Sequence, residues 1–243
     1  MEIEDGGRFA ATTSAEARAL QNRWREAIVP RGRVRAPRML AGVDVAIEST
    51  GHALAAAVAW EVASGAVREL RCARLALRFP YVPGLLAFRE GPAVLAALAR
   101  LETPVDAVLI DGAGVAHPRG LGLAAHVGLC LPVPCVGVAK SRLCGSATEP
   151  GPEPGEWTPL LDAEGRRIGT ALRTRARARE LFISPGNRLS QDGALALVLA
   201  ALRGHRLPEP TWHADRLGRA AKGRALDADG TLSGGLASIA GEG

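Results

Sequence analysis

Three segments in the first third of the chain show the hydrophobic pattern of β-strands. Apolar positions alternate along residues 39–48, and Asp44 lies on the less apolar face of that strand. Residues 52–62 and 67–77 are also apolar, and the Ser-Gly pair at 64–65 between them is typical of a hairpin turn. The pattern predicts three consecutive antiparallel strands, the first of which carries a carboxylate.

Two later apolar runs end on charged residues. Residues 105–110 lead into Asp111 and a glycine-rich stretch, and residues 135–139 lead into Lys140. A carboxylate beside backbone that lacks Cβ atoms suits a hard cation such as Mg²⁺, and glycines let a phosphate approach the main chain. An Asp-Gly turn and a solvated lysine at the end of a strand are the alternative interpretation, and this pattern alone leaves both open.

Helical segments are expected between and after the strands. Thr13 and Glu16 form a capping box, which starts a helix that continues to about Ile28 and ends before Pro30. The remaining predicted elements are a helix over 121–131, a hairpin of 157–161 with 167–173, a strand over 181–184, and helices over 190–203 and 208–217. Together the elements predict an α/β protein with a mixed central sheet flanked by helices.

The segment 83–101 is predicted to form two short helices. Gly91-Pro92 ends the first and starts the second, because glycine favours a helix C-terminus and proline the first turn. Glu90 is therefore expected at a helix C-terminus, where the macrodipole disfavours an acid.

Composition limits the class of protein. Of 243 residues, 47% are hydrophobic and 23% charged, which is ordinary for a globular protein, and the net charge of +5 fits a polyanionic partner. The four cysteines lack C-x-x-C spacing and are predicted to be small core residues, namely Cys72, Cys130, Cys135 and Cys144. The N-terminus has no apolar signal-peptide region and no stretch approaches a membrane span, so we expect a cytoplasmic monomer.

Basic and aromatic residues indicate contact with nucleic acid. Arginines are dense between 31 and 38 and between 166 and 179, as solvated charges or as contacts to phosphates. Tyr81 lies between Pro80 and Pro83 on a stiff loop, where its ring can insert into a base stack or pack beneath its own loop.

The chain is predicted to hold one catalytic domain. Residues 1–12 are expected to be disordered, residues 13–217 to form the domain, and residues 218–243, rich in alanine, glycine and mixed charge, to form a flexible tail.

Six ordered motifs resemble the endonuclease V family, the deoxyinosine-directed nucleases. They are AGVDVAI around Asp44, PYVPGLLAFRE from Pro80, DGAGVAHPRGLGLAAHVG from Asp111, GVAKSRLCG from Gly137, LFISPGNRLS from Leu181 and RLPEPT from Arg206. The resemblance implies an RNase H-like fold, consistent with three antiparallel strands of which the first bears an acid. It also implies a Mg²⁺-dependent enzyme, with Mn²⁺ as a substitute, that nicks DNA at the second phosphodiester bond 3′ to deoxyinosine.

The resemblance also implies roles for individual residues. Asp44 and Asp111 would ligate the metal, Glu90 would lie in its outer shell or bind a second ion, and Lys140 would neutralise the scissile phosphate. The loop that fills the gap left by the displaced base would consist of Pro80, Tyr81, Val82, Pro83 and Gly84. His117 and Asp215 match positions of further polar groups in the active site.

One departure from the family pattern is Asn187, which stands where the family has histidine after Pro-Gly. Asn187 can form hydrogen bonds but cannot take up or release a proton at neutral pH. If the family histidine transfers a proton, this enzyme should be slower or have a shifted pH optimum. If the histidine only positions other groups, little should change. Two alternative functions stay open: a ribonuclease acting on inosine in RNA, and a nucleic-acid-binding relative with impaired catalysis.

Overall fold

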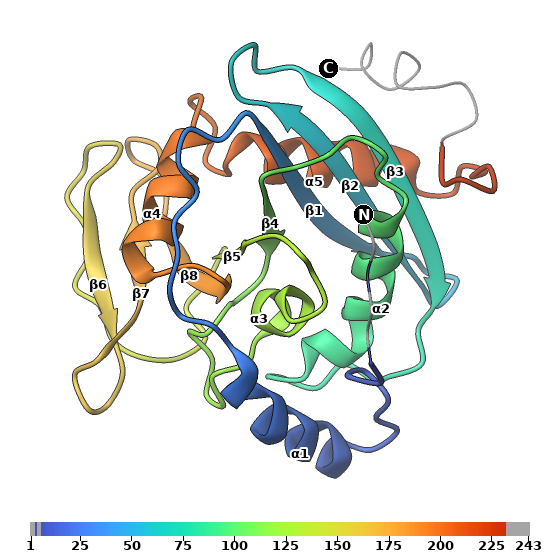
Figure 1. The fold of residues 1–243 in the computed structure, drawn as a ribbon, viewed down its shortest axis with the longest axis horizontal. Helices are drawn as coiled ribbons and strands as arrows, with labels where there is room; N and C mark the ends of the chain where they lie inside the picture. Colours follow the sequence, from blue (N-terminus) through green and yellow to red (C-terminus); the bar gives the residue numbers. More distant parts are fainter. Residues whose placement is uncertain (1–2, 4–5, 232–243) are drawn as a thin grey trace.

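An eight-stranded mixed sheet forms the centre of the protein (Figure 1). The computed structural model describes residue 3 and residues 6–231. The strand order is β3-β2-β1-β4-β5-β8-β7-β6. The strands are β1 (Met39–Ile47), β2 (His52–Glu61), β3 (Val67–Ala76), β4 (Ala107–Asp111), β5 (Cys135–Ala139), β6 (Trp157–Leu161), β7 (Arg167–Leu172) and β8 (Leu181–Asn187).

The pairing of the strands confirms the predicted fold class. β1, β2 and β3 are consecutive antiparallel neighbours, whereas β1, β4 and β5 run parallel, and β8, β7 and β6 extend the sheet antiparallel. The predicted hairpin of 157–161 with 167–173 therefore forms the outer edge of the same sheet. This arrangement is an RNase H-like fold, as the sequence predicts.

Helices cover both faces of the sheet. α2 (Leu86–Ala99) and α3 (Leu123–Gly128) pack on one face, while α4 (Gln191–Ala200) and α5 (Glu209–Ala221) pack on the other. Alternate β1 residues serve the two layers: Val43 packs with α2 and α3, whereas Leu40 packs with α4. α1 (Ser14–Trp24) begins at the predicted capping box of Thr13, and its Gln21 side chain donates to the Leu121 carbonyl just before α3.

The prediction of two helices between residues 83 and 101 is wrong. α2 is continuous from Leu86 to Ala99 with Pro92 inside it, so Glu90 lies within the helix rather than at a C-terminus. Pro92 is exposed, whereas apolar residues on both sides of it are buried on the sheet, and this burial outweighs the lost backbone hydrogen bond. A Cβ atom on Gly91 would come within 2.4 Å of the Phe9 ring, so glycine is needed here for close packing.

Other boundaries differ from prediction by a few residues. β8 continues to Asn187 because its backbone pairs with the whole of β5, and α3 ends at Gly128. α5 continues to Ala221, where its buried face packs on β2. Cys72, Cys130 and Cys135 are buried, as predicted, and all four cysteines are free. The prediction of a core position is wrong for Cys144, which is only partly buried because it follows an exposed segment after β5.

The two terminal segments contact the domain where they are described. Phe9 is buried against α2 and α3, so the segment expected to be disordered packs on the core at this residue. Gly230 accepts a hydrogen bond from the Cys72 amide, 2.8 Å away. Residues 1–2, 4–5 and 232–243 lie outside the described residues. Among the described helices, none is long and apolar enough to cross a bilayer.

Candidate active site

Asp44, inside β1, lies beside Asp111, the last residue of the parallel strand β4. Val43 on β1 is paired with Ile110 on β4, so the next residues of both strands come together. Their carboxyl groups share a hydrogen bond. The alternative interpretation of Asp111, a simple Asp-Gly turn, does not account for a second carboxylate at this contact.

Lys140 and Asp215 complete the cluster. Lys140 follows β5, the next parallel strand, and its ammonium forms an ion pair with Asp111 and lies 3.6 Å from Asp215 Oδ1. Asp215 is on α5, which sits directly against β1: a Cβ atom on Gly42 would come within 2.1 Å of Pro210. The small residue two positions before Asp44 therefore lets α5 bring a third carboxylate to the site.

The charges of the cluster perturb one another. Burial, together with the negative charge of Asp111, raises the pKa of Asp44 to about 8. Burial also raises the pKa of Glu90 to about 7, with a further contribution from Asp111. Burial disfavours the charged form of Lys140, but Asp111, Asp44 and Asp215 outweigh it and the pKa of Lys140 is raised. The site concentrates negative charge that one lysine balances only in part.

The donor set fits Mg²⁺. Asp44, Glu90, Asp111, Lys140 and Asp215 line one cavity, and its ligating atoms are all carboxylate oxygens, which hard cations prefer. In the described part of the chain no three acidic, histidine or cysteine side chains form a ready metal cage. Mg²⁺ does not need one, because it keeps several waters and takes one or two protein carboxylates.

A second cavity of about 280 Å³ adjoins the carboxylates, and its size suits a nucleobase. Its wall includes the loop from Tyr81 to Gly84, the glycine-rich segment after Asp111, and Lys140. The Tyr81 side chain is 69% exposed, so it does not pack beneath its own loop. Leu143 also lines the cavity and is exposed; the sequence analysis missed it, although an apolar residue within a polar segment was the available signal.

The carbonyl of Gly84 anchors the Tyr81 loop. It accepts hydrogen bonds from His117 Nε2 at 2.9 Å, Gln21 Nε2 at 3.0 Å and Arg119 Nη2 at 2.7 Å. Burial lowers the pKa of His117 to about 4, so the ring is neutral and its Nδ1 accepts from the Arg119 amide. His117 therefore braces the loop. Gln21, which also donates to the Leu121 carbonyl, was not identified from the sequence.

Asn187 is not part of this cluster. It is paired with Cys135, the first residue of β5, whereas Lys140 follows the other end of that strand. Its buried amide donates to the Gly128 carbonyl, and its oxygen accepts from the Val29 and Arg188 amides. These contacts join α3, β8 and the segment after α1, which favours a positioning role over proton transfer.

An RNase H-like sheet that combines two carboxylates on neighbouring parallel strands, a lysine and a base-sized cavity defines a nuclease. The comparisons with known proteins agree. The Endonuclease V family model matches residues 22–216. A curated Endonuclease V from Xanthomonas oryzae is 49% identical over 89% of this chain and 92% of its own length. The chain therefore belongs to the Endonuclease V family, the deoxyinosine-directed DNA repair endonucleases.

Solved structures give the same result. The Endonuclease V of Streptomyces avermitilis superposes with a TM-score of 0.81 at 41% identity, covering 87% of this chain and 93% of that one. A Ciona intestinalis Endonuclease V, solved with a DNA 24mer containing an inosine followed by a ribo-adenosine, shares the fold with a TM-score of 0.75 at 22% identity, covering 85% and 95% of the two chains.

Proposed function

We propose that this protein uses Mg²⁺ to hydrolyse the second phosphodiester bond 3′ to a deoxyinosine, with Mn²⁺ as a substitute. The observation that carries the proposal is the contact between Asp44 and Asp111 beside a base-sized cavity. The family resemblance of the six motifs supports the position of the cut.

Asp44 and Asp111 are proposed to hold the metal ion. When bound, Mg²⁺ supplies Lewis-acid chemistry that activates a water and stabilises the leaving oxygen. The raised pKa of Asp44 supports this role, because a divalent cation relieves the repulsion that makes two neighbouring carboxylates share a proton. Glu90 and Asp215 line the same cavity and are proposed to orient waters around the ion.

Lys140 is proposed to place its ammonium against the scissile phosphate. Its ion pair with Asp111 holds it at the edge of the metal site, and its raised pKa keeps it charged at neutral pH. A fixed positive charge beside a phosphate stabilises charge that develops during hydrolysis.

The loop from Pro80 to Gly84 is proposed to recognise the lesion. A base inside a duplex is reached most directly by extruding it, and an exposed aromatic ring can take its place in the stack. Tyr81 stands exposed at the mouth of the cavity that would receive the displaced base, and the bonds to the Gly84 carbonyl keep the loop in position.

One assay separates the candidate functions. Matched duplexes with deoxyinosine or deoxyadenosine, and an RNA with inosine, are incubated with the protein in Mg²⁺ or in EDTA. We expect a nick two bonds 3′ to deoxyinosine in Mg²⁺ only. Faster cleavage of the RNA would favour the ribonuclease, and binding without a nick on any substrate would favour the catalytically impaired relative.

A further inference from the structure

The arginines between residues 166 and 179 differ in whether an acidic side chain pairs with them. Arg166 pairs with Asp162 and Glu164, and Arg167 pairs with Asp192, so these charges are neutralised locally. Arg175, Arg177 and Arg179 are exposed, and their guanidinium groups make no ion pair within the described residues; the same holds for Arg142. Four free guanidinium groups are therefore available to a partner.

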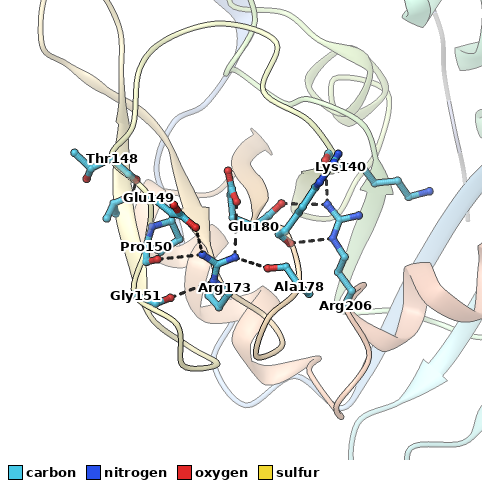
Figure 2. A network of polar contacts seen from close by, with 11 residues as sticks. Lys140, Thr148, Glu149, Pro150, Gly151, Arg173, Ala178, Glu180 and Arg206 are labelled. Carbon is cyan, nitrogen blue, oxygen red and sulfur yellow. Dashed lines mark hydrogen bonds and ion pairs between the residues drawn. The ribbon is translucent and has the colours of Figure 1, made fainter.

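Arg173 holds together the loops around these free arginines (Figure 2). Its guanidinium is buried and donates to the carbonyls of Gly151, Pro150 and Ala178. It also pairs with Glu149 at 2.8 Å and Glu180 at 3.9 Å. Arg173 therefore holds the loop that carries the free arginines and engages the two carboxylates that would otherwise repel an anion there.

Arg206 connects the same loop to the active site. Its Nε donates to the Arg179 carbonyl at 2.9 Å, and its Nη2 donates to the Lys140 carbonyl at 3.0 Å and the Glu180 carbonyl at 3.2 Å (Figure 2). One planar side chain thus fixes the backbone of the proposed phosphate-neutralising lysine relative to the backbone of Arg179.

A cavity of about 500 Å³ lies between the segment after β5, residues 140–149, and residues 171–182. Arg142, Thr148 and Arg179 line it, and it shares Lys140 and Ser141 with the base-sized cavity. We propose that this cavity, the arginine groove, binds a backbone phosphate of the lesion-containing strand outside the segment between lesion and cut. The inference rests on the proposed function, since it takes the neighbouring cavity as the lesion site.

The chemistry of the arginine groove fits a phosphodiester. Guanidinium forks match phosphate geometry, and the neighbouring hydroxyls of Ser141 and Thr148 can donate further hydrogen bonds. The groove offers no aromatic platform for a base, because Phe182 is its one lining aromatic residue and is half-buried. The strand can enter it from the 5′ or the 3′ side of the lesion, and the experiment distinguishes these.

The test compares the double variant Arg142→Gln/Arg179→Gln with the control Arg25→Gln/Arg68→Gln. The control removes the same charge from two exposed arginines that pair with acids away from the groove. Binding is measured in EDTA, so no turnover occurs, on single strands with a central deoxyinosine and on strands whose 5′ or 3′ flank is shortened to a few nucleotides.

We expect the double variant to bind the full strand about tenfold or more weakly and to lower the log–log salt slope by roughly 0.7 for each lost phosphate contact. Shortening the flank that occupies the groove should weaken binding by the wild type by a similar factor. The same shortening should not change binding by the double variant, because its groove contact is already lost. The flank that shows this difference is therefore the one in the groove. Equal losses on full and shortened strands, or an equal loss in the control, would overturn the proposal.

The variant Asp111→Asn separates this inference from the proposed function. Suppose that neither the wild type nor any variant nicks deoxyinosine, while binding by the wild type and by Asp111→Asn still depends on the flank. The phosphate site in the groove is then supported and the proposed chemistry is wrong. If wild type and Asp111→Asn bind full and shortened strands alike while wild type nicks, the chemistry stands and the groove is wrong.

Discussion

At the scale of single residues, position rather than residue type decides which acids join the carboxylate cluster. Asp106 accepts hydrogen bonds from the Arg38 and Met39 amides and serves the backbone. Asp111, five residues later, faces Asp44 and Lys140 because β4 ends there. Both acids flank the same apolar run, and strand order alone distinguishes them.

Tyr81 gives the residue-scale prediction. Tyr81→Ala should weaken binding to a deoxyinosine duplex by roughly ten- to a hundredfold, since base–aromatic stacking contributes about 1–3 kcal/mol. A single strand has less stacking to replace, so the loss there should be smaller. Tyr81→Phe keeps the ring and serves as the control. Equal losses on duplex and single strand, measured by equilibrium binding, would reject intercalation of the ring.

The strand-end residues were predictable from the sequence because their signal is local. Asp111 and Lys140 each follow a short apolar run, and such runs end at the edge of a sheet. Gln21 gave no such signal: its partners, Gly84 and Leu121, are 63 and 100 residues away in sequence. Arg173 likewise looked like one of a row of exposed arginines until packing placed it inside.

At the scale of elements, α2 shows where local rules fail. Gly91-Pro92 is a strong local signal to stop a helix, yet packing of both halves on the sheet and of Phe9 over Gly91 keeps it continuous. As a result Glu90 is held within a rigid helix whose burial raises its pKa. The local propensity was correctly recognised, but tertiary burial outweighed it.

The interface of α2 with α3 predicts an acid-sensitive fold. His126 on α3 is fully buried, with its ring stacked on Phe9 at 4.4 Å and edge-on to Phe88 at 5.2 Å. Burial lowers the pKa of His126 to about 4, and the positive charge of Arg8 lowers it further. The folded state therefore resists protonation that the unfolded chain accepts near pH 6.5.

The protein should therefore lose stability as the pH falls. This contribution to stability is full above pH 6.5 and is lost as the pH falls toward about 4, by roughly 2 kcal/mol at pH 5 for one histidine. His126→Phe keeps the aromatic contacts and removes the titration. Urea unfolding at pH 7 and pH 5 should show a smaller drop in the free energy of unfolding for this variant, and an unchanged drop would contradict the account.

At the scale of the whole molecule, three neighbouring cavities meet at Lys140. The carboxylate cavity lies toward β1, the base-sized cavity lies beneath the Tyr81 loop, and the arginine groove lies toward β8 and β7. The acids and the lysine of the first cavity, and the Tyr81 loop of the second, could be named from the sequence because each lies in its own local motif. The third joins residues 140–149 to residues 171–182 and depends on the pairing of β5 with β8 and β7.

The central claim is that Asp111 ligates the ion that drives cleavage. The most direct test is the single-turnover rate at which Asp111→Asn nicks a deoxyinosine duplex in saturating Mg²⁺, with binding measured in parallel. Asparagine preserves the size of the side chain but removes the charge, so the rate should fall about a thousandfold or more while the duplex is still bound. A rate near that of the wild type would contradict the account.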